Sequence, residues 1–281
     1  MTCCTMAGTL SRPAERIVSL APSLTETVFC LGLEKKLVGV TEQCDVPPAA
    51  VDKPVAGTFS RPDIERISQL EADLVLGLAR FHSRLAEQLV DAGIPLITFD
   101  YRTVDDVFSC MREIARLADA DGTAAPAIRR LRDRLAAVRA ATHGRRSPRA
   151  FRLMTDDPLV TPSLSCYQTD AMHLAGAVTM HLDVEEPYTP VSLDEVAEFD
   201  PEVILACGTD GGQLTKRRCK GCRAVAPLCV RDVREFARKD VWKDMSACRQ
   251  GRIHAVPCGV LCRPGPKIID GIEMMTSLFS T

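Results

Sequence analysis

Residues 16–40 read RIVSLAPSLTETVFCLGLEKKLVGV and contain a strand, a loop, a helix and a second strand. The run at residues 16–20 is β-branched and apolar, whereas the apolar residues from 25 onward recur at helical spacing until Gly32. Ser23 and Glu26 have the spacing of a capping box at the start of that helix. Residues 37–40 return to strand character. The stretch therefore predicts an α/β protein.

The same alternation continues along the chain. Further strands are expected near residues 73–78, 95–99, 151–154, 203–207 and 253–256. Further helices are expected near residues 64–70, 82–92, 104–117, 169–175, 193–198, 230–236 and 266–279. Because short strands alternate with helices of about ten residues, the pattern predicts parallel sheets covered by helices on both faces.

Residues 123–142 predict one long amphipathic helix, in which Ile128, Leu131 and Leu135 form an apolar stripe at steps of three and four. Such a helix is about 30 Å long, enough to run across two lobes. We therefore predict two α/β lobes with central parallel sheets, joined by a single long linking helix. The expected domains are an N-terminal tail (1–14), an N-terminal lobe (15–120), the linking helix (121–145) and a C-terminal lobe (146–281) with a cysteine-rich segment at 207–262.

Composition and motifs exclude several classes of function. The net charge of −2 is spread over interspersed basic and acidic residues, so we expect no nucleic-acid partner. The sequence has no GxSxG, GxxxxGK[ST] or HExxH motif, and we expect no enzymatic activity. His82 and His143 stand alone in helical or linker contexts and are expected to be solvated polar residues.

The order of several short motifs resembles a known family. RIVSLAP at residues 16–22, LVGV at 37–40 and DVPP at 45–48 resemble the opening of the cobalamin and siderophore solute-binding proteins. Further matches are DIERI at 63–67, ADLVL at 72–76, VSLDEV at 191–196 and DPEVI at 200–204. EQCDVPP at 42–48 and RPGPKIIDG at 263–271 look most similar to cobalamin-binding members that lack an export signal. The resemblance implies two lobes joined by one long helix.

That resemblance implies an ABC-transporter-type solute-binding protein that captures a corrinoid or another metal chelate in the cleft between its lobes. It implies a monomer that requires no cofactor and has a transporter permease as its partner. Ligand contacts are expected in the loops after the carboxyl ends of the strands, where parallel sheets bind ligands. The candidate ligand-binding residues are Gln43, Cys44, Phe59, Leu78, Met154, Tyr188, Cys207, Cys258 and Cys262. Among the positions matched to aromatic contacts of cobalamin binders, only Phe59 and Tyr188 are aromatic, which departs from the cobalamin pattern.

Two acidic residues match positions at which importer-associated members dock on arginines of the membrane subunit. Glu65 and Asp194 are these residues. Acidic side chains in the first turn of a helix are also favoured by the helix dipole alone. Both interpretations of Glu65 and Asp194 stay open at this point.

The chain contains 13 cysteines, and its C-terminal part offers an alternative function. Cys219 and Cys222 have the C-x2-C spacing of a metal-binding pair, and Cys207 and Cys229 could complete a zinc or iron–sulfur site. A redox-active thiol pair and unligated cysteines are the other interpretations. The alternative function is therefore a cysteine-rich metal or iron–sulfur protein, or a redox enzyme, on the same fold.

The first 13 residues bear on location. They contain no basic segment followed by an apolar run of about 7 to 15 residues, so we expect no signal peptide and a cytoplasmic protein. The adjacent Cys3 and Cys4 leave a second interpretation, a periplasmic or membrane-anchored protein whose start has been misplaced.

Overall fold

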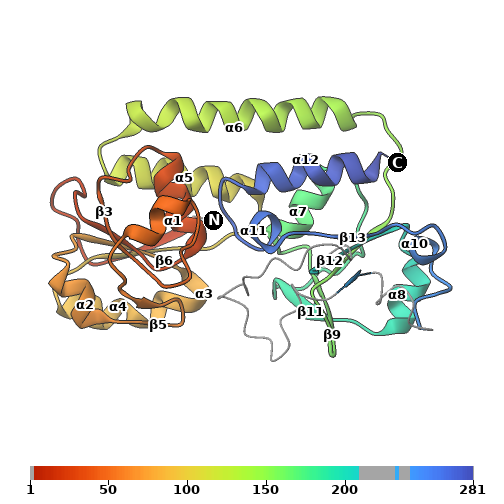
Figure 1. Cartoon of the computed structure of the whole chain (residues 1–281), viewed down its shortest axis with the longest axis horizontal. Helices are drawn as coiled ribbons and strands as arrows, with labels where there is room; N and C mark the ends of the chain where they lie inside the picture. Colours follow the sequence, from red (N-terminus) through yellow and green to blue (C-terminus); the bar gives the residue numbers. More distant parts are fainter. Residues whose placement is uncertain (1–2, 209–231, 234–240, 281) are drawn as a thin grey trace. The chain divides into compact units, whose positions relative to one another are not determined.

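The computed structural model describes residues 3–208, 232–233 and 241–280. The chain divides into two units, the first comprising Met1–Tyr101 and Asp105–Arg132, the second Arg102–Val104 and Asp133–Thr281. The long helix predicted at residues 123–142 is α6 (Asp121–Thr142), which begins in the first unit and ends in the second (Figure 1). Each unit contains a parallel sheet with helices, so the predicted α/β class is confirmed.

The first unit is built on a five-stranded sheet in the order β1-β7-β6-β2-β3. Its strands are β1 (Cys4–Ala7), β2 (Ile17–Ser19), β3 (Leu37–Val40), β6 (Leu74–Leu78) and β7 (Leu96–Phe99). The last four are parallel, whereas β1 pairs with β7 in the antiparallel direction. Strand β1 lies in the segment that we expected to be a tail. Its side chains are mostly half-buried, so the apolar pattern gave no sign of this edge strand.

Helices cover both faces of this sheet (Figure 1). They are α1 (Pro22–Cys30), α2 (Ile64–Gln69), α3 (Ala79–His82), α4 (Ala86–Asp91) and α5 (Val104–Leu117), with 3-10 turns at Pro48–Asp52 and Ser83–Leu85. On one face, Val18 and Val75 of the strands pack with Ile67 of α2 and Leu89 of α4. The helix expected at residues 82–92 is thus divided into two short helices and a turn. A hairpin of two short strands, β4 (Gly57–Thr58) and β5 (Arg61–Pro62), precedes α2.

The capping box predicted for the first helix is wrong. Helix α1 has Ala21 as its N-cap and Pro22 in its first turn, with no side-chain cap. Ser23 and Glu26 are buried residues of the helix, so their side chains pack inside the protein and do not cap the start of the helix. A capping box is formed by Ser192 and Glu195, at the start of α8 (Leu193–Phe199) in the second unit.

The second unit holds a three-stranded parallel sheet in the order β13-β12-β8. The strands are β8 (Ala150–Leu153), β12 (Val203–Ala206) and β13 (Ile253–Ala255). A small antiparallel sheet, which the sequence did not predict, consists of β9 (Thr155–Asp156), β10 (Leu159–Pro162) and β11 (Tyr188–Pro190). The remaining helices are α7 (Tyr167–Leu174), α10 (Ser246–Arg249), α11 (Cys258–Leu261) and α12 (Ile268–Phe279). The helix expected at 230–236 falls almost entirely outside the described residues.

Strand alternation places the side chains of β8 on two faces. Phe151 and Leu153 join an apolar core with Ile204 of β12 and Val196 of α8. Arg152, which lies between them in sequence, therefore projects from the opposite face, where its guanidinium contacts Gln168 of α7. A charged side chain is thus inserted into the interior of the second unit.

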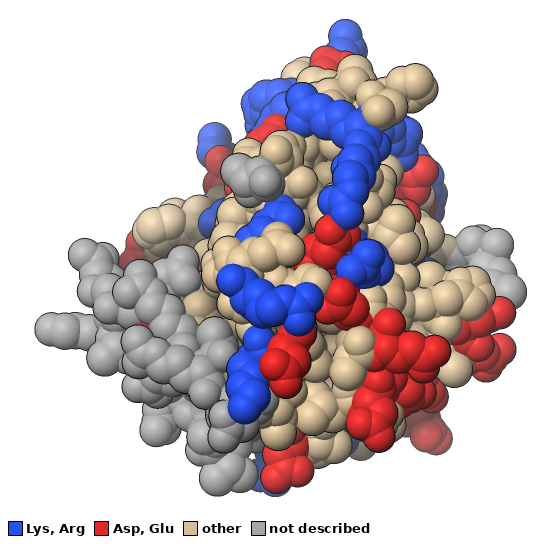
Figure 2. All heavy atoms as spheres, turned by 90° about the vertical axis from the view of Figure 1, so that its right-hand side faces the viewer, with Lys and Arg blue, Asp and Glu red and all other residues tan. Residues whose placement is uncertain are grey.

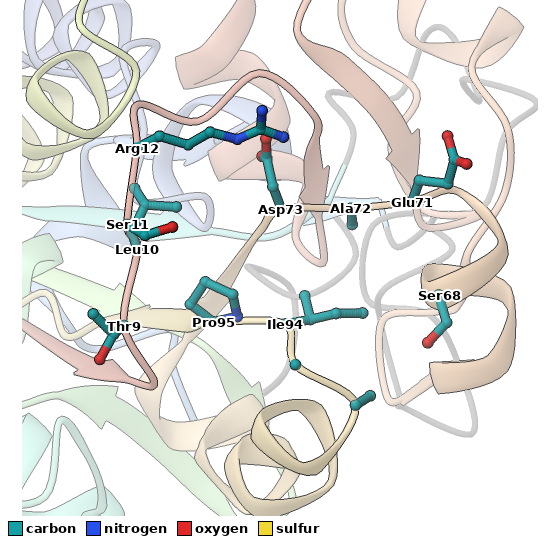
Figure 3. Close-up of a pocket in the computed structure, with 12 residues that line it drawn as sticks. Thr9, Leu10, Ser11, Arg12, Ser68, Glu71, Ala72, Asp73, Ile94 and Pro95 are labelled. Carbon is teal, nitrogen blue, oxygen red and sulfur yellow. The ribbon is translucent and has the colours of Figure 1, made fainter.

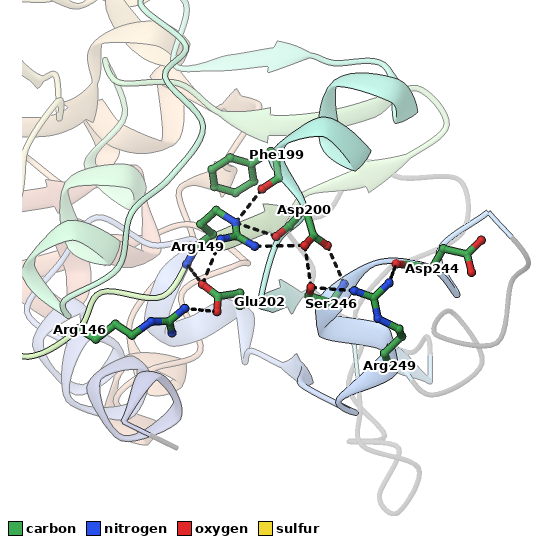
Figure 4. Close-up of polar contacts among 8 residues, drawn as sticks. All are labelled: Arg146, Arg149, Phe199, Asp200, Glu202, Asp244, Ser246 and Arg249. Atoms are coloured by element: carbon green, nitrogen blue, oxygen red, sulfur yellow. Dashed lines mark hydrogen bonds and ion pairs between the residues drawn. The ribbon is translucent and has the colours of Figure 1, made fainter.

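An ion-pair network fixes the amino ends of β8 and β12 (Figure 4). Arg149 donates through Nε to the backbone oxygens of Phe199 and Asp200, each at 2.8 Å. The Asp200 carboxylate accepts hydrogen bonds from the backbone and the hydroxyl of Ser246, which begins α10. Glu202 accepts from the backbone N–H of Arg149. These bonds hold the amino ends of the two strands in register. The carboxyl ends of β8 and β12 are not part of this network.

Charges of both signs are adjacent on the surface. On the face shown in Figure 2, described Lys and Arg side chains lie next to Asp and Glu side chains. Two surface ion pairs of the second unit are Arg146 with Glu202 and Arg134 with Glu273. Glu202 is largely buried, whereas both partners of the Arg134–Glu273 pair are partly exposed, and a pair of that kind contributes about 0–1 kcal/mol. Among the described residues, no helix is both long and apolar enough to span a bilayer.

Candidate functional site

In the first unit, the structure joins three of the predicted ligand-binding residues through two loops and a hairpin. Gln43 lies after β3, and its Oε1 accepts a 2.7 Å hydrogen bond from the backbone N–H of Phe59. Phe59 lies in the turn between β4 and β5. Leu78 is the last residue of β6 and is linked to Phe59 by His82. The loops near the carboxyl ends of β3 and β6 therefore form one connected group.

His82 makes this connection through both ring nitrogens. Nδ1 accepts from the backbone N–H of Leu78 at 2.9 Å, so it carries no proton, and Nε2 donates to the backbone oxygen of Phe59 at 2.8 Å. The side chain is fully buried, and the prediction that it would be a solvated residue is wrong. Burial lowers the pKa of His82 below its usual 6.5, and the nearby Arg84 acts in the same direction. The ring is thus a neutral structural bridge.

Aromatic rings gather around this bridge. The rings of Phe59 and Phe81 are tilted, with centroids 4.9 Å apart, and the ring of His82 meets Phe59 edge-on at 5.1 Å. These separations lie in the range of favourable aromatic pairs. Phe81 keeps 41% of its surface exposed, so part of this aromatic cluster faces solvent. The first unit therefore presents a preformed aromatic surface beside the end of β6.

Cys44 lies next to Gln43 in sequence but points into the protein. Its side chain is buried, and its sulfur contacts the hydroxyls of Thr25 at 3.1 Å and Thr41 at 3.3 Å. The Thr25 hydroxyl also donates to Ser19 Oγ. These contacts connect the end of β2, the start of α1 and the end of β3, which gives Cys44 a structural environment.

In the second unit, Tyr188 is the first residue of β11 in the small antiparallel sheet, and Met154 directly precedes β9 of the same sheet. The Tyr188 hydroxyl accepts a 3.0 Å hydrogen bond from Gln168 Nε2, and burial raises the pKa of the phenol well above its usual value. Met154 follows β8, and its backbone N–H donates to the oxygen of Val160 in β10. Both residues are half-buried, so part of each side chain is accessible.

The predicted cysteines Cys207 and Cys262 meet at a buried arginine. Arg152 is 1% exposed and donates through Nη2 to Cys207 Sγ at 3.0 Å and Cys262 Sγ at 3.3 Å. It also donates through Nη1 to the backbone oxygen of Leu205. Cys258 contributes a hydrogen bond to Cys262. Sequence reasoning missed Arg152, although a charged residue in the middle of the apolar strand AFRL was a visible signal.

The remaining predicted residues are placed separately. Glu65 and Asp194 are exposed and lie in the first turns of α2 and α8. Of the proposed metal ligands, Cys219, Cys222 and Cys229 lie outside the described residues, whereas Cys207 contacts Arg152. Within the described part of the chain, no group of three or more His, Cys, Asp or Glu side chains is arranged to hold a metal ion.

A surface pocket of about 390 Å³ lies elsewhere in the first unit (Figure 3). It is lined by Asp73 and Pro95, which directly precede β6 and β7. The pocket is therefore at the amino ends of these strands, opposite the edge where parallel sheets bind ligands. The Asp73 carboxylate accepts backbone hydrogen bonds from Glu15 and Arg16, which gives it a structural task. No predicted ligand-binding residue lines this pocket.

Comparison with known proteins defines the class. The chain belongs to the periplasmic binding protein family, whose model matches residues 17–257. The resemblance inferred from the sequence motifs is thereby confirmed, and the chain is a member of a solute-binding family.

The similar proteins include vitamin B12-binding and heme-binding proteins. The vitamin B12-binding protein of Vibrio cholerae serotype O1 is 25% identical over 268 residues, which cover 94% of this chain and 88% of the relative. The crystal structure of the periplasmic vitamin B12 binding protein BtuF of Vibrio cholerae superposes with a TM-score of 0.75 at 24% identity, covering 95% and 97% of the two chains. The periplasmic heme-binding protein RhuT from Roseiflexus sp. RS-1 gives a TM-score of 0.76 at 25% identity, covering 95% and 98%.

These findings correct the expected location. The family is one of periplasmic binding proteins, and the two solved structures named above are described as periplasmic, so the prediction of a cytoplasmic protein is wrong. That prediction depended only on Met1 to Pro13, which lie outside the matched region and carry none of the family's motifs.

Proposed function

We propose that the protein captures a corrinoid, or a related tetrapyrrole metal chelate, and presents it to an ABC transporter permease without altering it chemically. The observation that carries the proposal is the rigid aromatic surface of Phe59 and Phe81, which His82 ties to the end of β6. Flat macrocycles bind well to aromatic side chains because these rings bury a large area at a small entropic cost.

A corrinoid is the favoured ligand within this class. A relative that spans 94% of this chain is named a vitamin B12-binding protein, whereas structural neighbours of the same fold include heme-binding proteins. Tyr188 adds a half-buried phenol in the second unit, positioned by Gln168. We propose Phe59 and Tyr188 as the principal ligand contacts, with Gln43, Leu78 and Met154 beside them. The Cys207, Cys258 and Cys262 loops are further candidate contacts.

Substitution of the two aromatic contacts tests this proposal. Phe59→Ala and Tyr188→Ala should each weaken the binding of cyanocobalamin or dicyanocobinamide by about 1–3 kcal/mol, or roughly 5- to 150-fold, because apolar contact area is lost. Spectrophotometric titration of the purified variants gives the affinity. Val90→Ala and Val178→Ala, which shorten exposed apolar side chains in the two units, are matched controls and should bind normally. Wild-type affinity in both aromatic variants would remove these residues from the site.

A further inference from the structure

The pocket of about 390 Å³ at the amino ends of β6 and β7 has one wall that is fixed by hydrogen bonds (Figure 3). This wall consists of residues 68–73, which join the end of α2 to the start of β6. Arg16 donates through Nε to the backbone oxygens of Leu70 and Glu71, and through Nη2 to Leu70 again. The Asp73 carboxylate accepts the backbone N–H of Arg16 at 2.9 Å. The pocket is therefore preformed on this side.

Two exposed side chains of opposite charge lie on opposite sides of the pocket. Figure 3 shows Arg12, in the loop after β1, on one side and Glu71 on the other, with Ala72 and Asp73 between them. The Asp73 carboxylate is engaged by backbone N–H groups. The Glu71 side chain is 82% exposed, and its ion pair with Arg16 is long, at 3.7 Å. The pocket therefore offers one cation and one anion to a small molecule.

The space between these two charges is small and partly apolar. Ala72, Ile94 and Pro95 line it, and all three residues are buried. The volume of about 390 Å³ lies near the lower end of the range of ~300–1,000 Å³ that is typical of small-molecule sites. The pocket thus fits a compact molecule that combines charged groups with a short apolar body.

Glu71 has a backbone conformation that favours glycine. Its φ is +49°, and it directly follows the C-cap of α2. Helices α1 and α4 have glycines at the same position, Gly32 with φ +75° and Gly93 with φ +74°. A glutamate in this conformation costs backbone strain, which is typical of positions where a particular side chain is needed for function. At position 71, the group that a glycine would not supply is the carboxylate.

We propose that this pocket is a second binding site, which takes a small zwitterion of the α-amino-acid type, with the ligand's carboxylate at Arg12 and its ammonium group at Glu71. A guanidinium pairs with a carboxylate through two parallel N–H donors, and an ammonium group donates to a carboxylate. A short aliphatic side chain fits against Ile94 and Pro95. The site lies at the strand ends opposite the proposed chelate contacts of the same unit, so it does not depend on the proposed function.

NMR titration of the whole ¹⁵N-labelled protein with L-leucine at low ionic strength tests the proposal. Saturable shifts of backbone amides should centre on residues 9–12, 68–73 and 92–95, with a dissociation constant of about 1 mM or lower. 4-Methylpentanoate lacks the ammonium group of leucine, and 3-methylbutylamine lacks its carboxylate. Each should bind at least tenfold more weakly, because only one charged contact forms. Absence of saturable shifts with L-leucine, shifts centred on other segments, or equal binding of the three compounds would overturn the proposal.

Two variants assign the charged contacts. Arg12→Gln and Glu71→Gly should each weaken the binding of L-leucine at least tenfold. Glu71→Gly should also leave the melting temperature unchanged or raise it, because glycine adopts a positive φ without strain. Asp119→Gly is the matched control, since Asp119 is an exposed acid with φ +48° that follows α5 and does not line the pocket, and it should bind L-leucine normally. Wild-type affinity in Arg12→Gln or Glu71→Gly, or an equal loss in Asp119→Gly, would show that the assigned contacts are wrong.

Discussion

At the scale of single residues, the imidazole of His82 controls the geometry of the aromatic surface. It accepts from the backbone of Leu78 and donates to the backbone of Phe59, and its ring packs against Phe59. Both backbone groups would lose their partner if the ring nitrogens were removed. Each unsatisfied buried polar group costs about 1–3 kcal/mol. His82 is therefore a positioning residue for the proposed ligand contact.

Replacing His82 by Phe keeps an aromatic ring but removes both hydrogen bonds. We expect His82→Phe to lower the free energy of unfolding by roughly 2–4 kcal/mol in urea denaturation, and to weaken the binding of dicyanocobinamide. His143→Phe changes an exposed histidine and is the matched control, with an expected effect within about 0.5 kcal/mol. A variant of His82 as stable as the control would show that the bridge contributes nothing.

The same residue predicts a pH dependence. Because its pKa in the folded protein lies below the usual 6.5, the fold favours neutral His82. The contribution of His82 to stability is therefore complete above pH 6.5 and is lost as the pH falls through its lower value in the folded state. The stability difference between wild type and His82→Phe, measured in urea from pH 7.5 to 5, should shrink on acidification. A difference that stays constant over this range contradicts the protonation state assigned here.

At the scale of elements, the hairpin β4–β5 carries Phe59, and Gly57 determines its shape. Gly57 has φ +93°, and a Cβ at this position would lie 2.7 Å from both Arg61 O and Asp63 N. These atoms belong to the backbone and cannot rotate away. Gly93 also has a positive φ, +74°, but nothing lies within 4 Å of its Cβ position. The two glycines separate the effect of backbone strain from that of a steric clash.

Gly57→Ala should therefore cost more than Gly93→Ala. We expect Gly93→Ala to lower stability by about 1 kcal/mol through its positive φ, and Gly57→Ala to lower it by at least about 2 kcal/mol and also weaken dicyanocobinamide binding, because the hairpin must move. Thermal unfolding and ligand titration measure the two effects. Equal losses in both variants, with unchanged binding, would mean that the hairpin does not position Phe59.

The sequence predicted elements with strong periodicity and missed those defined by backbone pairing. Helix α6 carries a regular apolar stripe and was found within two residues of its bounds. The strands β9 and β11 have two and three residues, which are too few to show alternation. In the candidate site, the family resemblance predicted Gln43, Phe59 and Tyr188 as ligand contacts, but spacing could not show that Cys44 points inward. Nor could it reveal His82 or Arg152 as buried, since both depend on contacts between segments distant in sequence.

At the scale of the whole molecule, the two units contribute exposed acids that we propose for docking on a permease. Glu65 and Asp194 occupy matching positions in the first turns of α2 and α8. Acidic groups on a surface mainly guide association with a basic partner. In the part of the chain that the structure describes, no hydrogen bond or ion pair explains why both helices carry an acid at this position. The helix dipole alone also favours acids there.

Charge reversal distinguishes docking from a helix-dipole effect. Glu65→Lys combined with Asp194→Lys should leave the affinity for dicyanocobinamide unchanged and should reduce corrinoid uptake at least tenfold in cells that carry the variant gene in place of the natural one. Glu198→Lys alters an exposed acid later in α8 and is the control. Normal uptake with the double variant, or a loss equal to that of the control, assigns the two acids to helix stabilisation alone.

The central claim is that the protein binds a tetrapyrrole metal chelate reversibly and leaves it unchanged. Calorimetric titration of the purified wild-type protein with dicyanocobinamide, cyanocobalamin and hemin tests this claim most directly. We predict saturable binding of a corrinoid at one ligand per chain, with a dissociation constant of about 1 μM or lower, and recovery of the intact ligand after unfolding. Absence of saturable binding for all three compounds by folded protein, or recovery of a chemically altered ligand, would contradict the account.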